Sequence, residues 1–255
     1  APPCVLIAGG RPDQAEDFES CGIQAFIHAP TLDLLQQYVS EGATNLILEG
    51  RECGGHVGPV GSLVLWEQCL TWLTHTELPK PANSYHIVLA GGIADPASCA
   101  TARILSAKPK AIGVRMGILT GTPYLYTDEA VSTGAIVESY RETVIGASRT
   151  VNLETGAGHA SRCAVTPFAH EFQQLKDTYI TAGLSGYQLR EELEKVTLGR
   201  LRLATKGIKR NATGLVSVSD DESYRDGMYM LGQSAALLGE KTTISELHQR
   251  LTSRT

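Results

Sequence analysis

Short apolar runs alternate with helical patterns along the first half of the chain. Strands are predicted at residues 4–8, 24–28, 45–48, 86–90 and 111–114, with helical patterns between them. The runs are apolar throughout rather than at every second position, which is typical of strands buried on both sides. Successive parallel strands need a crossover, usually a helix, to join them. The sequence therefore predicts an α/β fold whose parallel sheet is covered on both faces.

The pattern changes after Thr143. Residues 152–166 are expected to be irregular, and 168–206 to be helical with a break at 183–186. A polar connector is predicted at 211–225, followed by terminal helices at 228–238 and 244–251. Two domains follow from this change: an α/β part at 1–142 and a mainly helical C-terminal subdomain at 143–255 that packs on it.

Composition and charge narrow the classes of function. A chain of 255 residues can bury a sizeable core, and its apolar share of 42% is ordinary for a globular protein. The net charge of -5, without a dense basic face, argues against nucleic acid as a partner. No apolar run approaches the roughly 18 residues that a membrane span needs, so no membrane partner is expected.

The six cysteines lie far apart in the sequence, at positions 4, 21, 53, 69, 99 and 163. None of the spacings is that of a paired metal motif, so we expect no metal site, reduced thiols and a cytoplasmic location. The one basic run, Arg200–Arg210, has two interpretations. It is either a solvated helix face or a contact for a phosphate-bearing substrate or carrier.

Three predicted loops contain glycine and follow strands: 49–59, 91–95 and 115–122. Gly91 and Gly92 precede a predicted helix, so their N–H groups and the helix N-terminus could receive an anion. Gly121 and Thr122 add backbone donors and a hydroxyl. Because the last two loops follow consecutive strands, they resemble the split phosphate site of a (β/α)8 barrel. Ordinary tight turns are the alternative interpretation.

His56 lies in the loop 49–59, among four glycines and at the carboxyl end of a predicted strand. Parallel α/β folds bind ligands at this end, and an imidazole exchanges protons near neutral pH. We therefore predict proton transfer for His56, although most histidines are structural. Cys53 is interpreted as structural, and His159 is a weaker candidate for touching a substrate.

Four segments of the chain have distinctive motifs: Glu52-Cys-Gly-Gly-His56-Val-Gly, Val88-Leu-Ala-Gly-Gly-Ile-Ala-Asp95, Gly121-Thr-Pro-Tyr-Leu-Tyr-Thr127 and Gly227-Met-Tyr-Met-Leu-Gly-Gln233. These segments resemble the nitronate monooxygenase (2-nitropropane dioxygenase) family. Their order and spacing match the family and cover most of the chain. The stretches around Leu48–Pro59 and Leu198–Gly207 are most similar to flavin-dependent domains of polyketide and polyunsaturated fatty acid synthases, some of which are enoyl reductases.

The resemblance implies a TIM-barrel type (β/α)8 fold that lacks its first three strands, with residues 1–142 as the later five. It also implies an FMN cofactor and His56 as the catalytic base. The residues implied to bind the cofactor are Gly54, Gly55, Ala90, Gly91, Gly92, Gly117, Gly121, Thr122 and Gln233. Gly117 shares this role with Gly121 because the chain has two glycines where the family has one Met-Gly-Thr.

The function expected from the resemblance is FMN-dependent oxidoreduction of a nitronate or of an enoyl thioester. The substrate would be a small molecule or bound to an acyl carrier. Expected protein partners are the rest of a multidomain synthase or a second copy. A flavin-free, phosphate-binding barrel isomerase or lyase and a non-catalytic fragment of a synthase remain alternatives. An open five-stranded sheet, with a different strand order, is the alternative architecture.

Overall fold

The computed structural model describes residues 2–253, which form two compact units. Unit 1 contains the chain up to Glu52 and then Gly58–Thr120. Unit 2 contains Cys53–Val57 and Gly121–Ser253. None of the helices within residues 2–253 has the length and apolar content that crossing a membrane requires.

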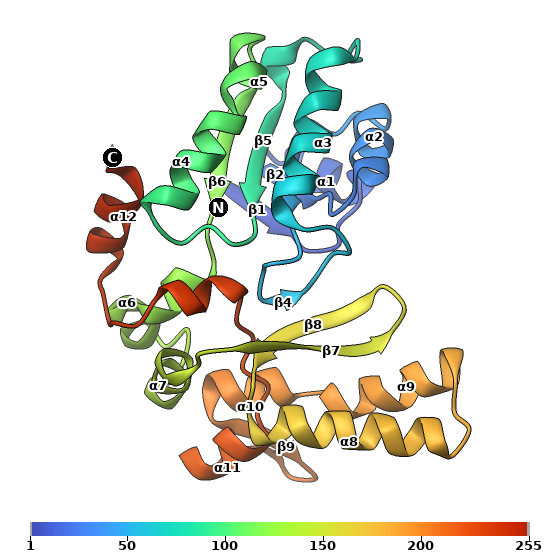
Figure 1. The fold of residues 1–255 in the computed structure, drawn as a ribbon, viewed down its shortest axis with the longest axis vertical. Coiled ribbons are helices and arrows are strands. Elements are labelled where there is room, and N and C mark those ends of the chain that lie inside the picture. Colours follow the sequence, from blue (N-terminus) through green and yellow to red (C-terminus); the bar gives the residue numbers. More distant parts are fainter. Residues whose placement is uncertain (1, 254–255) are drawn as a thin grey trace. The chain divides into compact units, whose positions relative to one another are not determined.

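Unit 1 combines a parallel sheet with helices (Figure 1), and the strands of this sheet are adjacent in the order in which they occur in the chain. The strands are β1 (Cys4–Ile7), β2 (Gln24–His28), β3 (Asn45–Glu49), β5 (His86–Ala90) and β6 (Arg115–Leu119). The helices are α1 (Pro12–Glu19), α2 (Leu32–Ser40), α3 (Ser62–His75), α4 (Pro96–Leu105) and α5 (Ala107–Ala111), with a 3-10 turn η1 (Ala82–Ser84). The predicted α/β class with a parallel sheet is confirmed.

The helices of unit 1 follow one face of the sheet. Parallel crossovers are right-handed, so strands that never reverse their order place every crossover on the same side. In agreement with this, α3 contacts α2, α4 and α5. This winding is that of a barrel rather than of a doubly wound sheet, where the order reverses. The described strands do not close on themselves, so the complete eight-stranded barrel remains a prediction.

The two faces of the sheet differ, which corrects the expectation that helices cover both. The helix-covered face carries Ile27, Leu46, Leu48, Ile87 and Leu89, none of which is exposed. The opposite face, called the inner face here, carries Phe26, Ile47 and Ala90, which pack together with Val88 and Leu119. By strand register the inner face also carries ionisable side chains, among them His28, Glu49, His86 and Arg115.

The fifth strand lies later in the chain than predicted. Residues 107–111 form the short helix α5, and Gly113 turns the chain at φ 102° before β6 begins at Arg115. An apolar run of four residues is too short to distinguish a strand from a helix end. As a result Gly117 lies in the middle of β6, opposite Val88, and not in a loop.

Unit 2 combines helices with two small antiparallel sheets. Its sheets join β4 (Gly55–His56), β8 (His159–Ala164) and β7 (Thr150–Gly156), and separately β9 (Ile208–Asn211) and β10 (Gly214–Ser217). Its helices are α6 (Asp128–Ser132), α7 (Glu138–Gly146), α8 (Pro167–Thr181), α9 (Gly186–Thr197), α10 (Arg200–Lys206), α11 (Asp220–Asp226) and α12 (Ile244–Thr252). Two 3-10 turns, η2 (Thr122–Tyr126) and η3 (Gln233–Leu237), complete it.

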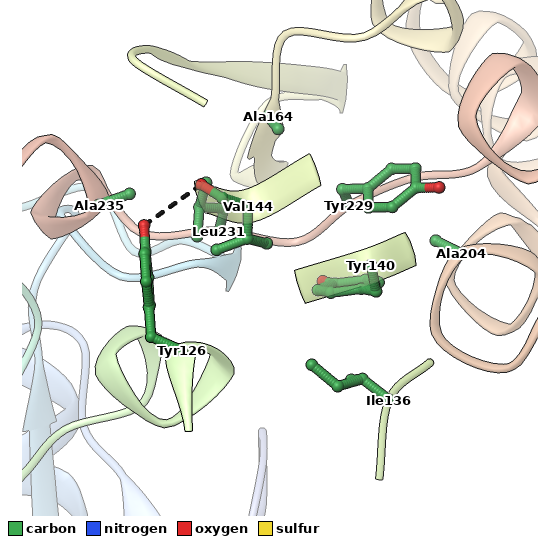
Figure 2. Packing of buried hydrophobic residues seen from close by; sticks show 9 residues of the cluster. All are labelled: Tyr126, Ile136, Tyr140, Val144, Ala164, Ala204, Tyr229, Leu231 and Ala235. Carbon is green, nitrogen blue, oxygen red and sulfur yellow. Dashed lines mark hydrogen bonds between the residues drawn. The ribbon is translucent and has the colours of Figure 1, made fainter. Parts of the chain in front are cut away.

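Three tyrosines lie in one of the core clusters of unit 2, together with aliphatic side chains (Figure 2). The rings of Tyr140 and Tyr229 lie 4.9 Å apart, and both residues are almost fully buried. Their neighbour Tyr126 donates its hydroxyl to the carbonyl of Val144 at 3.3 Å. The Tyr140 hydroxyl donates to the carbonyl of Met230 at 2.8 Å. This bond ties α7 to the segment that leads into Gly232 and Gln233.

Three sequence expectations for unit 2 are wrong. The segment expected to be irregular at 152–166 lies largely in the hairpin β7–β8. The expected connector at 211–225 contains β10 and α11, and the expected helix at 228–238 is an extended segment followed by η3. The helices expected at 168–206 and 244–251 are confirmed.

Candidate functional site

The chain after β3 is anchored in unit 1 by a carboxylate. Glu52 accepts hydrogen bonds from the backbone N–H of Ser62, at 2.7 Å, and from its hydroxyl. Ser62 is the first residue of α3, so Glu52 satisfies a donor that the helix leaves open. Gly50 donates its N–H to the carbonyl of Ala90 at 3.0 Å, which links this loop to the end of β5.

The loop after β5 requires glycine for two reasons. Gly91 and Gly92 have φ values of 97° and 76°, which side chains rarely adopt. A Cβ on Gly91 would also lie 2.5 Å from the Ser62 hydroxyl oxygen. The two loops therefore pack backbone against backbone, and the glycines have a structural reason independent of any ligand.

The same loop offers hydrogen-bond donors. Within residues 2–253, the N–H groups of Gly92 and Ile93 have no acceptor, although Ile93 is only 2% exposed. Buried N–H groups nearly always find a partner, so the N–H of Ile93 suits an anion or another acceptor, and the half-buried Gly92 adds a second donor beside it. The N-terminus of α4 does not add to them as expected, because Asp95 and Ser98 cap it reciprocally.

The other predicted residue of unit 1, Gly117, does not join this loop. A Cβ there would contact Val88 and His86 on the inner face. The chain leaves β6 through Thr120, whose hydroxyl donates to the carbonyl of Ile93 at 2.6 Å. The loops after β5 and β6 are therefore adjacent, as expected for consecutive strands.

In unit 2 the structure brings three of the resembling segments together. Gly54 packs so closely on Leu231 and Gly232 that a Cβ would lie 2.6 Å from the Gly232 nitrogen. The Thr122 hydroxyl accepts the N–H of Gly232 at 3.0 Å. Gln233 is exposed directly after this junction. Gly55, at φ 76°, continues from Gly54 into β4.

His56 lies beside this junction with its side chain exposed. The flexible loop predicted for it is instead a two-residue strand, in which Gly55 and His56 pair with Arg162 and Ser161 of β8. The Cys53 thiol donates to the carbonyl of His56 at 3.3 Å, which agrees with a structural role for Cys53. The backbone of His56 is fixed while its imidazole stays accessible, a combination suited to proton exchange.

Gly121 and Thr122 belong to unit 2, whereas Ala90, Gly91 and Gly92 belong to unit 1. Their joint role in binding one phosphate remains a prediction from the sequence. Gly121 has no sterically required role, since a Cβ there would meet open space.

Two other sequence candidates are held by internal contacts. His159 and Arg190 lie within hydrogen-bonding distance, 2.8 Å, on the surface. In the basic run, Arg200 donates to backbone carbonyls of Val196 and Asp226. Lys206 donates to carbonyls of Gly134 and Ala135, and Lys209 pairs with Glu222. Structural roles thus account for these three of the five basic residues in the run.

Sequence analysis missed one pair of ionisable groups. His28 and Glu49 are the last residues of the adjacent strands β2 and β3, with 3.9 Å between Nε2 and Oε2. Burial raises the pKa of Glu49 to about 7 and lowers the pKa of His28. The sequence did contain a signal for this pair, because each of two apolar strands ends in an ionisable residue.

A parallel sheet wound in chain order, with glycine-rich loops at its carboxyl edge, places the chain in the class of parallel α/β folds, to which (β/α)8 barrels belong. No family model and no curated protein matches the chain. Solved structures do match it. FabK from Thermotoga maritima is 23% identical with a TM-score of 0.67, over 98% of this chain and 66% of that one.

A nitroalkane oxidase from Streptomyces ansochromogenes is 18% identical with a TM-score of 0.61, over 98% of this chain and 62% of that one. The chain thus spans about two thirds of the length of the structures it matches. At these identities the comparison establishes a shared fold. It agrees with the resemblance of the four segments to the nitronate monooxygenase family.

Proposed function

We propose that the chain is the flavin-binding part of an FMN-dependent oxidoreductase similar to nitronate monooxygenases. Its substrate is a nitronate, or an enoyl thioester of polyketide or fatty acid synthesis. One observation carries the proposal. Gly54, Thr122 and Gly232 come from three segments that resemble the family, and they meet in unit 2 through direct contacts. His56 stands accessible beside them.

The residues of unit 1 suit the phosphate of FMN. The N–H groups of Gly92 and Ile93 lack acceptors within residues 2–253, and a phosphate oxygen accepts such bonds. The nearby Glu52 carboxylate is occupied by Ser62. Gly91 and Gly92 keep side chains away from this backbone, so an anion can approach.

Bound FMN would supply the exchange of an electron pair with the substrate. The chain's own part is to move a proton. The imidazole of His56 would take the proton from the carbon of the parent nitroalkane, which leaves the nitronate, or would orient the nitronate itself. With an enoyl thioester it would give a proton to the carbon next to the thioester carbonyl after the hydride has been added. The strand β4 holds its backbone during this transfer.

The test is to purify the protein, denature it and identify released small molecules by mass spectrometry. FMN is expected, together with the visible absorbance of oxidised flavin before denaturation. An isomerase or lyase is the second candidate, because the unpaired N–H groups fit any phosphate. It would be favoured if inorganic phosphate raised the melting temperature and no flavin were bound.

A further inference from the structure

A second set of chemical groups lies on the inner face of unit 1. His28 and Glu49 end neighbouring parallel strands, at the edge where such sheets bind ligands. By register they share a face with Ile47, Val88 and Ala90, which are apolar. Their side chains are 18% and 28% exposed, so they are partly buried and still reachable.

The side chains of His28 and Glu49 are too far apart to form a hydrogen bond with each other. The closest nitrogen and oxygen are 3.9 Å apart, beyond hydrogen-bond distance, and no hydrogen bond to another described residue engages either side chain. The strand partner of Glu49 on β5 is Ala90, and the backbone carbonyl of Glu49 is approached by Gly58. Among residues 2–253, His28 is the one side chain able to carry a positive charge that lies within ion-pair distance of Glu49.

We propose that Glu49 is a hydrogen-bond donor to a conjugated carbonyl or nitro oxygen of a ligand bound at this edge, with His28 as its positioning residue. This inference rests on the proposed flavin-dependent function. Either the flavin ring or the substrate provides such an oxygen. Removing the donor would leave a buried acceptor unpaired on the ligand, which is costly.

The protonation of the pair fits this role. Burial raises the pKa of Glu49 to about 7, so near neutral pH much of the carboxyl keeps the proton that it needs to donate. Burial also lowers the pKa of His28, so both groups are driven toward their neutral forms. Two neutral groups do not form an ion pair, which agrees with their separation.

Three variants separate the possibilities. Glu49→Gln keeps a neutral donor of the same length, whereas Glu49→Leu keeps the volume and removes the donor. Glu19→Gln is the matched control, because Glu19 accepts from Asn45, the first residue of the same strand. This control neutralises a carboxylate at the opposite end of β3.

The first readout needs no flavin. Infrared difference spectra between wild type and Glu49→Gln should show a protonated carboxyl at about pH 6 that disappears by about pH 8, on either side of the pKa of about 7. Wild type minus Glu19→Gln should lack this band. A Glu49 carboxyl that is ionised throughout this range overturns the proposal.

The second readout identifies the ligand. If the acceptor is the flavin, Glu49→Leu should bind FMN roughly tenfold more weakly and shift its absorbance, with Glu49→Gln close to wild type at about pH 6. If the acceptor is the substrate, FMN binding is unchanged and kcat/KM falls by about tenfold or more in Glu49→Leu. His28→Asn should move the infrared transition of Glu49 in pH.

If Glu49→Leu binds FMN and turns over substrate as well as the wild type does, the assignment of Glu49 is overturned and the proposed function stands. A wild-type protein that binds no flavin overturns both. The two failures are therefore distinguished by the wild type alone.

Discussion

The imidazole of His56 is exposed while its backbone is paired with Ser161 of β8. Because the side chain makes little contact, His56→Ala should change the free energy of unfolding by less than about 1 kcal/mol. Under the proposed role of His56, its loss removes a general acid or base and should slow turnover by about 10² or more. Steady-state kinetics of the flavin-loaded enzyme and chemical denaturation measure the two effects. His75→Ala, at the exposed end of α3, is the control. Equal activity of both variants would contradict the role of His56.

The pKa of Glu49 also makes stability depend on pH. The folded state raises this pKa from 4.5 to about 7, so between these values the folded chain binds more protons than the unfolded chain. The contribution of Glu49 is therefore most favourable below about pH 4.5 and declines as the pH rises through about 7. Glu49→Gln should thus stabilise the protein relative to wild type above pH 7, by at most about 3 kcal/mol.

The measurement is urea unfolding of wild type and Glu49→Gln at several pH values. Comparing the two proteins largely cancels the opposite effect of His28, whose lowered pKa favours folding as the pH rises. A difference that does not change between about pH 5 and pH 8 would show that Glu49 is not buried as described.

Alanine substitutions at two glycines separate a packing role from a role in ligand contact. Gly121 is exposed and a Cβ there meets open space, so Gly121→Ala should fold normally. Gly92 has φ 76°, and a Cβ would lie 3.3 Å from Glu52, so Gly92→Ala should be destabilised by about 1 kcal/mol or more. FMN titration combined with melting temperatures tests both. If Gly121→Ala binds FMN more weakly without losing stability, a position of Gly121 at the phosphate is supported. If its FMN binding is unchanged, Gly121 is not a phosphate contact.

Among the elements, α3 depends on a carboxylate from outside the helix. Glu52 receives both donors of Ser62, the first residue of α3, whereas the N-cap residue Gly61 has no side chain. Glu52→Ala should therefore cost about 1–2 kcal/mol of stability, as the loss of a helix cap does. Glu67→Ala, on the exposed side of α3, is the control for loss of a surface carboxylate. Similar denaturation midpoints for both variants would contradict the capping role.

The sequence predicted elements well where burial governs them. The strands at Gln24–His28 and His86–Ala90 match their predicted bounds, because continuous apolar runs belong to a buried parallel sheet. It failed in unit 2, where β7 and β8 contain Asn152, Glu154 and Arg162 within a polar pattern. The pairing of these strands with each other and with β4 stabilises them, and this is a long-range effect that no local pattern records.

The same limit applies to the candidate site. Glycines at strand ends indicated the loops correctly, since Gly55, Gly91 and Gly92 all have positive φ. Gly117 was misplaced because β6 begins only after Val114. The pair of His28 and Glu49 could not be found, because their approach depends on the register of two strands and not on spacing in the sequence.

At the scale of the whole molecule, cysteine reactivity reports on folding. Cys4 and Cys21 are exposed, whereas Cys53, Cys69, Cys99 and Cys163 are buried. Burial raises the pKa of both Cys69 and Cys163 to about 12, so their reactive thiolate is rare. Under native conditions an alkylating reagent should modify Cys4 and Cys21 first. Mass spectrometry over time, with a denatured sample as control, measures this. Rapid modification of Cys69 would mean that unit 1 opens readily.

The strand order of unit 1 leaves β1 and β6 with one neighbour each among residues 2–253. Leu6 on β1 is 51% exposed and Ile118 on β6 is 41% exposed, so apolar surface accompanies the unpaired backbone at both edges. Any polypeptide able to add parallel strands there would bind the folded chain and not the unfolded one. Its presence would then stabilise the fold by mass action. The thermal stability of this protein would accordingly vary with the concentration of such a complementing segment, as in a protein reassembled from fragments.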